Sequence, residues 1–504
     1  MSDVDSSPDE PGGADTVASL LSAGTTGPAL VTVDGASIDH GSLRREVSRL
    51  AGALRAAGLG PQDRIAVVLP NGPEIALVLL AAMSVGCAAP LNPAYREDEF
   101  RFYLEDLRAS ALLTFEGASP AAHAAAPRGT LAVAVRGTGL DVELDTGRAG
   151  SPPDRRPTAD DRALVLHTSG TTSRPKIVPL RQRNLAASAR NIAASLHLEA
   201  ADRSLNVMPL FHIHGIMAGL LAPLSAGASV VCTPGFDAFR FHRWVDELAP
   251  TYYSAVPTMH QMVLARAPEP RPTSLRFARS SSAAMPRPVL EAVEALFGVP
   301  VVEAYGMTEA SHQMTSNPLP PGRTKPGSVG LASGIEVAIL DASNEPLAAG
   351  ERGEVSIRGA TVVDGYENNP GANEAAFTAG WFRTGDEGTL DDEGYLFLTG
   401  RLKEQINRGG EKISPIEVDE VLLRHPAVAE AVTFAIPHDK LGEDVGAAVV
   451  LAAGQEATEA DLRAYAGARL AAFKVPRRIV FVPEIPKGAT GKLQRIGLAQ
   501  KLDL

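Results

Sequence analysis

The chain has 504 residues, and 47 Lys or Arg against 59 Asp or Glu give it a formal net charge of −12. This acidic balance argues against a general nucleic-acid binder, for which a basic surface is expected. Only Cys87 and Cys232 are present, so a disulfide framework and a cysteine-based zinc site are excluded. The length predicts about two or three domains.

Residues 1–15 are acidic and rich in Ser, Pro and Gly, which predicts a disordered tail without the basic start or apolar core of a signal peptide. The longest apolar runs, 75–91 and 213–232, are interrupted and too short for a convincing membrane span. Each predicts a buried helix that leads into a buried strand. We expect no membrane span, and we expect the cytoplasm as the compartment.

The N-terminal third alternates helical and strand-like segments. Helical spacing is found at residues 38–57, 74–85 and 100–106, and short apolar strands are predicted at 64–69, 88–91 and 111–114. This βαβ order predicts a mainly parallel sheet covered by helices. Residues 116–160 are rich in Ala, Gly and Pro and weakly patterned, and we expect them to form a surface excursion.

A buried strand is predicted at residues 162–166, and a hydroxyl-rich loop with the cations Arg174 and Lys176 follows it. Backbone N–H groups, hydroxyls and cations at a strand end favour phosphate binding. The loop is not a Walker A motif, because its spacing differs and Ile177 stands where Ser or Thr would bind magnesium. The alternative is an ordinary polar loop.

Three further polar segments follow predicted strands. His212 and His214 have a spacing that suits a metal pair, but no third ligand is spaced nearby, which favours a structural role. Residues 277–286 are expected to be a polar loop that caps a helix or contacts a ligand. The strand at 299–304 is closed by residues 305–309 (Tyr-Gly-Met-Thr-Glu), which places Glu309 where a carboxylate can meet magnesium in a ligand crevice.

The last third of the chain changes pattern. Residues 330–400 have short alternating strands with Gly turns and predict a small β subdomain. Asp386 is suited to accept two vicinal hydroxyls. Beyond it, helices are predicted at 415–424 and 459–470, and strands at 428–435 and 445–450. These elements predict a compact α+β domain.

Five blocks together resemble the adenylate-forming superfamily, which includes acyl-CoA synthetases, adenylation domains and luciferases. The blocks are residues 166–180, 305–309, 381–386, 400–415 and 486–495. The phosphate loop departs from the family pattern at Ser173 and Ile177. Ser173 followed by Arg174, and the run Ser-His-Gln-Met-Thr-Ser-Asn-Pro at 311–318, resemble the oxalate–CoA ligase branch.

The resemblance implies an α/β fold with a large N-terminal domain of parallel-rich αβ layers and a small, mobile α+β C-terminal domain. The N-terminal AMP-binding domain would span 16–402 and include the β subdomain at 330–400. The C-terminal lid would span 403–504, with its hinge at Lys403.

The resemblance also implies a role for individual residues. Catalytic roles fall to Lys492, Thr308, Glu309 and His212, and Glu309 holds magnesium. ATP or AMP would be bound by Thr168, Ser169, Gly170, Thr171, Thr172, Lys176, Ala283, Ala284, Glu303, Ala304, Tyr305, Thr308, Asp386 and Arg401. The acid would be bound by His214, Ser281, Ser282 and His312, and coenzyme A by Gly410, His438, Lys440 and Lys474.

The implied reaction has two steps. A carboxylate attacks the α-phosphorus of ATP, with Mg²⁺ present, to give an acyl-adenylate and pyrophosphate, and coenzyme A then displaces AMP. Donors at the acid site favour oxalate, because a second buried charge needs partners. One alternative is another small or aromatic acid, or transfer to a carrier protein instead of coenzyme A. The other is a non-catalytic adenylate-binding protein.

Overall fold

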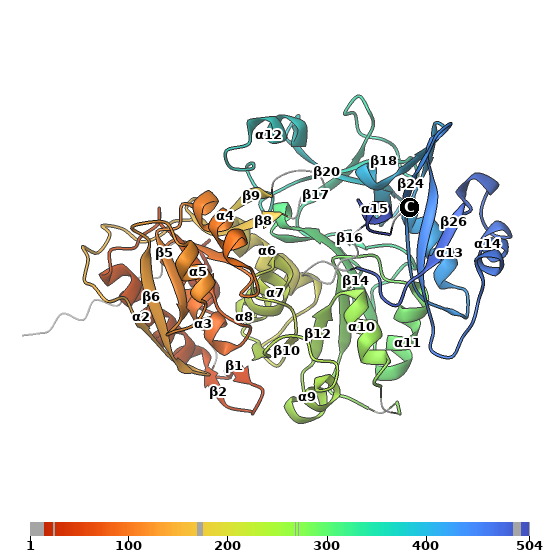
Figure 1. Ribbon diagram of the computed structural model, residues 1–504. Helices are drawn as coiled ribbons and strands as arrows, with labels where there is room; N and C mark the ends of the chain where they lie inside the picture. The colour runs from red at the N-terminus through yellow and green to blue at the C-terminus, as the bar shows by residue number, and fades with distance from the viewer. Residues whose placement is uncertain are drawn as a thin grey trace, which may run out of the picture.

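The computed structural model describes residues 15–23, 26–168, 175–267, 269–270, 272–486, 495–502 and 504. The chain runs from the red and orange N-terminal part at one side, through a green middle part, to the blue C-terminal part at the other side (Figure 1). Within the described ranges, no helix is both long and apolar enough to cross a membrane.

A seven-stranded sheet forms most of the N-terminal part, in the order β7-β6-β5-β3-β4-β8-β9. The pairs from β6 to β8 are parallel, and both edge strands are antiparallel. The parallel order follows from the predicted βαβ rhythm. The strands are β3 (Arg64–Val68), β4 (Cys87–Pro90), β5 (Ala111–Phe115), β6 (Leu131–Thr138), β7 (Asp141–Asp145), β8 (Arg162–Thr168) and β9 (Lys176–Arg181).

The prediction of a surface excursion at 116–160 is wrong for part of that segment. β6 pairs in parallel with β5 and extends the sheet, and β7 returns antiparallel to β6. Leu131, Val133 and Val135 alternate with more exposed residues and are buried in the core. The flanking Ala, Gly and Pro residues concealed this short period-two pattern.

A nine-stranded sheet forms the middle of the molecule, in the order β16-β15-β14-β13-β12-β10-β11-β1-β2. It is parallel from β14 to β1 and antiparallel at both edges. Its strands are β1 (Pro28–Thr32), β2 (Ser37–Asp39), β10 (Arg203–Asn206), β11 (Ser229–Cys232), β12 (Tyr252–Ala255), β13 (Phe277–Ser281), β14 (Val301–Met307), β15 (His312–Ser316) and β16 (Leu331–Ala332).

Two details of this sheet differ from the sequence prediction. Residues 277–281, expected in a polar loop, form β13, and β14 continues through residues 305–307. Polar side chains can occupy a central strand when neighbouring groups satisfy their hydrogen bonds, which sequence periodicity does not reveal.

Helices pack between and around the two large sheets. α3 (Pro73–Met83) is buried along its length, and the core cluster that contains it draws residues from both sheets. The two long apolar runs form α3 before β4 and α7, η1 and α8 before β11, as predicted. The other helices of this core are α1 (Val17–Leu20), α2 (His40–Ala56), α6 (Gln182–Ser195), α7 (Ile213–Ile216), η1 (Met217–Leu221) and α8 (Ala222–Ser225).

Two smaller core clusters lie outside this central layer. One joins the nine-stranded sheet to α9 (Phe241–Leu248), α10 (Pro257–Leu264) and α11 (Arg287–Phe297). The other joins the seven-stranded sheet to α4 (Glu97–Leu107) and α5 (Pro120–Ala125).

The β subdomain is an antiparallel sheet in the order β17-β18-β20-β19, with β21 also on β20. Its strands are β17 (Glu336–Leu340), β18 (Gly353–Arg358), β19 (Phe377–Thr378), β20 (Trp381–Leu390) and β21 (Leu396–Arg401), and α12 (Pro370–Ala376) precedes β19. β20 and β21 form an antiparallel hairpin within the predicted β subdomain.

The last sheet is built only from residues after 405, in the order β23-β22-β25-β24, with β26 on β25. Its two apolar clusters are separate from those of the large sheets. The elements are η3 (Leu402–Glu404), β22 (Ile406–Arg408), β23 (Glu411–Ile413), α13 (Pro415–Leu423), β24 (Val428–His438), β25 (Gly442–Leu451), α14 (Glu459–Gly467), η4 (Ala472–Lys474), β26 (Arg478–Phe481) and α15 (Leu498–Lys501). The domain boundary and the hinge at Lys403 stay predictions.

Candidate active site

β8 and β9 are antiparallel neighbours, and the predicted phosphate loop lies between them in the sequence. Thr168 and Lys176 face each other across the last rung of this hairpin. The predicted phosphate ligands Ser169, Gly170, Thr171 and Thr172 lie outside the described residues, so their roles stay predictions.

Lys176, Tyr366 and Glu309 form a compact group beside this hairpin. Lys176 Nζ lies 4.2 Å from the centre of the Tyr366 ring, and Tyr366 Oη donates a hydrogen bond of 2.8 Å to Glu309 Oε1. Burial lowers the pKa of Lys176, and the charge of Lys403 lowers it further, whereas Glu309 opposes the shift. One phenol therefore contacts a cation through its ring and a carboxylate through its hydroxyl.

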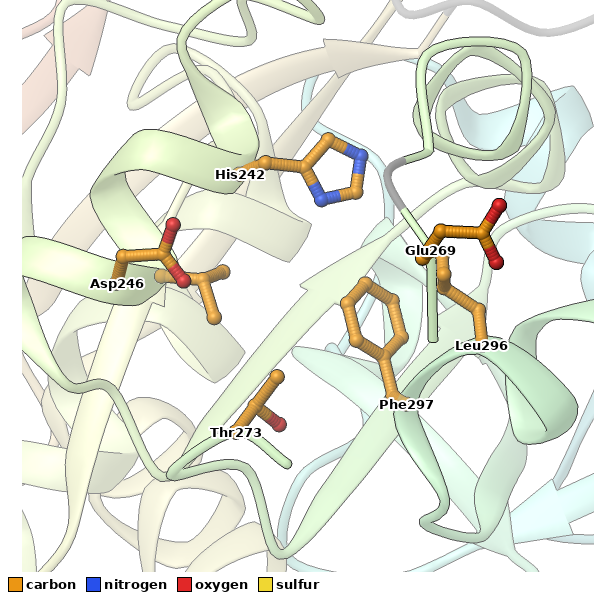
Figure 2. Close-up of a pocket in the computed structure, with 7 residues that line it drawn as sticks. His242, Asp246, Glu269, Thr273, Leu296 and Phe297 are labelled. Atoms are coloured by element: carbon orange, nitrogen blue, oxygen red, sulfur yellow. The ribbon is translucent and has the colours of Figure 1, made fainter. Parts of the chain in front are cut away.

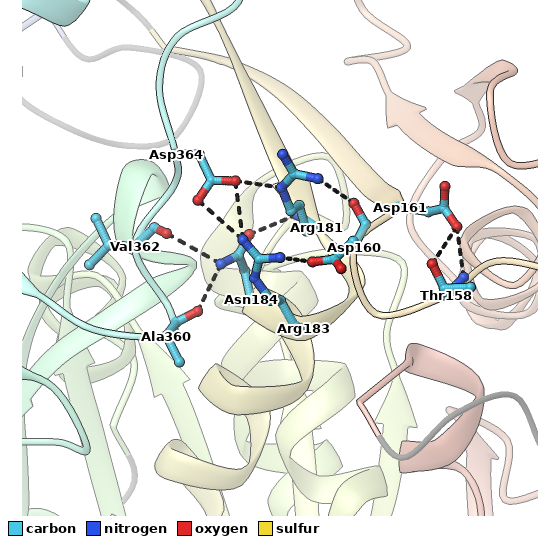
Figure 3. A network of polar contacts seen from close by, with 9 residues as sticks. All are labelled: Thr158, Asp160, Asp161, Arg181, Arg183, Asn184, Ala360, Val362 and Asp364. Atoms are coloured by element: carbon cyan, nitrogen blue, oxygen red, sulfur yellow. Dashed lines mark hydrogen bonds and ion pairs between the residues drawn. The ribbon is translucent and has the colours of Figure 1, made fainter.

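Tyr366 owes its position to a loop that is fastened to β9 and α6. The backbone N–H of Glu367 donates to the carbonyl of Ile177 at 3.1 Å. The Asn184 amide donates to the carbonyls of Ala360 and Val362 at 2.7 and 3.2 Å. Figure 3 shows that the loop is also held by ion pairs of Arg181 and Arg183 with Asp364.

Tyr305, Asp386 and Arg401 meet at the end of β14, although they lie far apart in the sequence. Tyr305 Oη donates to Asp386 Oδ2, and Arg401 Nε donates to Asp386 Oδ1 at 2.8 Å. Asp386 and Arg401 are also directly paired between β20 and β21. The structure thus brings together three of the residues that the family resemblance assigns to ATP or AMP.

Two of the predicted nucleotide contacts follow β13. Ser282 has a φ of 75°, and the exposed Ala283 and Ala284 come directly after it. Glu303, on neighbouring β14, has a pKa raised to about 7 by burial, against opposing effects of Arg287 and of a backbone hydrogen bond from Met285.

The predicted acid-binding residues also come together. The rings of His214 and His312 stack with centroids 4.7 Å apart, and His214 Nδ1 lies 3.1 Å from Ser282 Oγ. Ser281 is buried, and its hydroxyl has no hydrogen-bond partner among the described residues. His212 is the N-cap of α7, and its Nδ1 accepts the backbone N–H of His214 at 3.3 Å.

This acid-binding cluster adjoins the nucleotide motif through strand pairing. Met307 of β14 lies opposite His312 of β15. A Cβ added at Gly306 would stand 2.1 Å from the carbonyl oxygen of His312, so only glycine allows this approach. Thr308 and Glu309 follow in η2 (Thr308–Ala310).

Two residues of the site were not predicted. Arg279 is fully buried in β13 and hydrogen bonds His214 and His312, each at 3.3 Å. An arginine in an otherwise buried strand was the available signal. Tyr366 lies in a loop without periodicity, and only its aromatic character between Gly365 and Glu367 set it apart.

Magnesium fits the described residues only in part. Glu309 is buried and offers carboxylate oxygen, the ligand type that magnesium prefers. The described ranges contain no group of three His, Cys, Asp or Glu residues that would hold a metal by themselves. Glu309 therefore fits an ion held mainly by phosphate oxygens and water.

Lys492, the predicted catalytic lysine, lies outside the described residues. Arg495, which follows shortly after it, is anchored to Asp419 at 2.6 Å and to Glu404 at 3.4 Å. Glu404 is the neighbour of the predicted hinge, Lys403, which is exposed on η3.

The residues assigned to coenzyme A fall into two places. Gly410 is in the exposed β22–β23 turn with a φ of 100°, and Gly409 N donates to the carbonyl of Leu441 at 3.0 Å. His438 Nδ1 accepts the N–H of Lys440 at 3.2 Å beside that turn. Lys474 instead forms hydrogen bonds of 2.7 Å with both carboxylate oxygens of Glu417 on α13.

A pocket elsewhere contains none of the predicted site residues. It lies beside α9 and α11, and its lining includes His242, Asp246, Glu269, Thr273, Leu296 and Phe297 (Figure 2).

Comparison with known families decides what kind of protein carries these residues. Residues 22–367 match the AMP-binding enzyme family, and residues 417–492 match the C-terminal domain of AMP-binding enzymes. The chain belongs to the AMP-binding enzyme family. The predicted membership of the adenylate-forming superfamily and the predicted fold class are confirmed.

Individual relatives of this AMP-binding enzyme are similar over most of their length. The oxalate–CoA ligase of Arabidopsis thaliana is 47% identical over 475 residues, which cover 92% of each chain. The oxalate–CoA ligase of Saccharomyces cerevisiae is 44% identical over 473 residues, which cover 87% of each chain. The structure of ATP-bound MatB from Rhodopseudomonas palustris has a TM-score of 0.88 and 28% identity, covering 97% of this chain and 98% of that one.

Proposed function

We propose that this AMP-binding enzyme is an AMP-forming oxalate–CoA ligase. It converts oxalate, ATP and coenzyme A into oxalyl-CoA, AMP and pyrophosphate. Two relatives that are 47% and 44% identical over most of the chain are oxalate–CoA ligases, which supports this reaction.

The observation that carries the choice of acid is the polar character of the acid-binding cluster. The stacked rings of His214 and His312 are buried, and the latter lies opposite Met307 at the end of the nucleotide motif. A fatty-acid pocket requires apolar walls at this position, since an unpaired polar group is costly beside a hydrocarbon chain. A second carboxylate instead accepts the hydrogen bonds that such a cluster donates.

In the first step an oxalate oxygen attacks the α-phosphorus of ATP, the bond from that phosphorus to the bridging oxygen breaks, and pyrophosphate leaves. Asp386, Tyr305 and Arg401 hold the nucleoside, and Lys176 lies beside the phosphate loop. Lys492 bridges the reacting carboxylate and the α-phosphate. Positioning and charge neutralisation supply most of the catalysis in phosphoryl chemistry of this kind.

Magnesium, when bound, neutralises phosphate charge. Glu309 would hold it, and Tyr366 fixes that carboxylate through its 2.8 Å hydrogen bond. The donated hydrogen bond restricts the rotation of Glu309 and leaves its other oxygen available to a cation.

In the second step the sulfur of coenzyme A attacks the acyl carbon, and the bond from that carbon to the AMP oxygen breaks. Rotation of the C-terminal domain about Lys403 withdraws Lys492 and opens a path for the thiol near Gly410. His438 and Lys440 lie beside that path, whereas the pairing of Lys474 with Glu417 must open before Lys474 contacts a phosphate. We place the enzyme in the cytoplasm, where ATP and coenzyme A are both available.

The test is pyrophosphate release with ATP, Mg²⁺ and coenzyme A, compared for oxalate, malonate, acetate, octanoate and a cinnamate. We expect a strong preference for oxalate. His312→Ala should lower kcat/KM for oxalate by about 100-fold, because hydrogen bonds to charged groups contribute roughly 1.5–3 kcal/mol.

His242→Ala is the matched control, because His242 lies in the separate pocket and donates to a backbone carbonyl. It should leave all rates within about twofold of the wild-type values, since none of the predicted site residues lines that pocket. Turnover of octanoate or a cinnamate in place of oxalate would contradict the proposed substrate and leave the family assignment intact.

A further inference from the structure

Glu367 lies against two arginines of the seven-stranded sheet, although it belongs to the distant loop that carries Tyr366. Its Oε1 forms an ion pair with Nη2 of Arg64, the first residue of β3, and the side chains of Arg64 and Glu367 are only 11% and 17% exposed. Arg162, the first residue of β8, lies 3.8 Å from the other carboxylate oxygen, but its side chain is 44% exposed. Because water and salt weaken an exposed pair more than a buried one, the contact with Arg64 is the stronger of the two.

Arg64 is fixed independently of Glu367. Its Nη1 donates to the carbonyl of Leu107, at the end of α4, at 3.0 Å. Its backbone lies opposite Cys87 in the parallel pair of β3 and β4, and its carbonyl accepts the N–H of Ser110 at 2.9 Å. The guanidinium that meets Glu367 is therefore attached to both the sheet and α4.

Glu367 is also held through its backbone. Its N–H donates to the carbonyl of Ile177 at 3.1 Å, and the two residues form an isolated antiparallel bridge next to Lys176. One residue is thus attached to the N-terminal sheet at two strands, β3 through its side chain and β9 through its backbone. A shift of the loop along β9 would break the ion pair with Arg64.

Tyr366, the preceding residue, contacts two groups of the nucleotide site through its hydroxyl and ring, Glu309 Oε1 at 2.8 Å and Lys176 Nζ at 4.2 Å. Asn373 on α12 hydrogen bonds both the N–H and the carbonyl of Tyr366, at 2.7 and 2.9 Å. These bonds are local, because α12 follows the loop directly. The ion pair of Arg64 and Glu367 instead spans 303 positions of the chain and fixes the loop against the sheet.

We propose that Arg64 and Glu367 are positioning residues for the binding of magnesium-bound ATP. Their ion pair holds Tyr366 where its hydroxyl orients the carboxylate of Glu309, the residue that would hold the ion. The pair therefore acts on the bound metal through two intervening side chains. This inference rests on the proposed ATP-dependent activity and does not depend on the identity of the acid.

Glu367→Gln tests the proposal, because it removes the charge and keeps the shape of the side chain. ATP binding is measured by calorimetry without acid or coenzyme A, in the presence and absence of Mg²⁺, so the readout needs no turnover. Outer partners of metal ligands commonly change metal affinity by about tenfold or more, and this pair acts from one residue further away. We expect Kd for ATP to rise about fivefold with Mg²⁺ and less than about twofold without it.

A double variant separates action through Tyr366 from a general loosening of the loop. The hydroxyl that orients Glu309 is absent in Tyr366→Phe. In that background, Glu367→Gln should raise Kd for ATP with Mg²⁺ by less than about twofold, because coupled residues are not additive. Independent effects of the two substitutions would instead multiply.

Variants of the arginine test the same pair from its other side. Arg64→Met should reproduce the effect of Glu367→Gln, whereas Arg64→Lys keeps the charge and should stay within about twofold of the wild-type Kd. Arg276→Met is the matched control, because this arginine also pairs with a carboxylate, that of Asp202, and donates to a backbone carbonyl. It should leave Kd for ATP unchanged with and without Mg²⁺.

An unchanged Kd in Glu367→Gln, or equal rises with and without Mg²⁺, would overturn the proposal, and so would effects that multiply with that of Tyr366→Phe. If Arg64→Met does not fold, Glu367→Gln and Arg64→Lys decide, and a fivefold loss in a folded Arg64→Lys protein contradicts a role of the charge. A wild-type protein that binds no ATP with Mg²⁺ contradicts the proposed function. Selective use of an acid other than oxalate contradicts the proposed substrate alone.

Discussion

Arg401 and Arg279, at the two ends of the proposed active site, differ in their partners. Arg401, at the nucleotide end, donates to the carboxylate of Asp386, which also accepts the hydroxyl of Tyr305. Arg279, at the acid end, hydrogen bonds Ser254, Gln313 and the rings of His214 and His312, and no carboxylate of the described residues pairs with it. An ion pair therefore fastens the nucleotide end, whereas hydrogen bonds without a carboxylate fasten the acid end.

Asp386→Ala should have the largest effect on folding, because it removes the partner of Arg401 and the acceptor of Tyr305. Half of Arg401 remains exposed to water, so we expect the free energy of unfolding to fall by about 2–3 kcal/mol. Denaturant unfolding without ligands measures this change. Arg279→Met should change the same quantity by less than about 1 kcal/mol, because it removes a buried charge that has no carboxylate partner. Equal losses of unfolding free energy in the two variants would contradict this difference between Arg401 and Arg279.

Gly306→Ala tests the junction between the two ends. Its Cβ would stand 2.1 Å from the carbonyl oxygen of His312, so β14 and β15 must separate. We expect the free energy of unfolding to fall by about 2 kcal/mol. We also expect KM to rise more for oxalate than for ATP. Gly371→Ala is the matched control, since nothing lies within 4 Å of a Cβ added there. A Gly306→Ala enzyme as stable as this control would show that β14 and β15 leave room for a Cβ at this position.

Tyr366→Phe removes one hydrogen bond at the nucleotide end and keeps the ring beneath Lys176. The freed Glu309 carboxylate should raise the Mg²⁺ concentration needed for half-maximal pyrophosphate release by about fivefold, a change of about 1 kcal/mol. KM for oxalate should not change, because the acid end keeps its contacts. A rise in KM for oxalate alone would contradict this prediction, because it would place the role of Tyr366 at the acid end of the site.

Glu303 is the exception at the nucleotide end, because its effect appears as a dependence of stability on pH. Burial, with a smaller contribution from the charge of Glu420, raises its pKa from an ordinary value of 4.5 to about 7. Between these pH values the folded protein holds a proton that the unfolded chain has lost, so stability falls as pH rises. The unfolding free energy of wild type should therefore decline relative to Glu303→Gln from about pH 4.5 to 7. Parallel curves in a denaturation series would contradict this pKa.

The sequence predicted most of the regular elements, because apolar periodicity is a local property. α3 lies within a few residues of its predicted place, and β17, β18 and the β20–β21 hairpin form the predicted β subdomain. β6 and β7 were missed because their alternation is short and lies among Ala, Gly and Pro. Arg279 and Tyr366 were missed for another reason. Their importance depends on neighbours brought by other strands and loops, and no spacing along the chain records such contacts.

The grouping of Tyr305, Asp386 and Arg401, and that of His214, His312 and Ser282, followed from family blocks rather than from periodicity. The structure brings each group together, and the roles of its members stay predictions. Lys492 and the phosphate loop lie outside the described residues, so biochemical measurements must test them.

A competition experiment tests the central claim most directly. Wild-type enzyme is given ATP, Mg²⁺, coenzyme A and an equimolar mixture of oxalate, glyoxylate, acetate and octanoate, and the thioesters are identified by mass spectrometry. Oxalyl-CoA should be the dominant product, because oxalate is the acid in this mixture that brings a second charged group to the polar acid-binding cluster. A product mixture dominated by the thioester of a monocarboxylic acid would contradict the account.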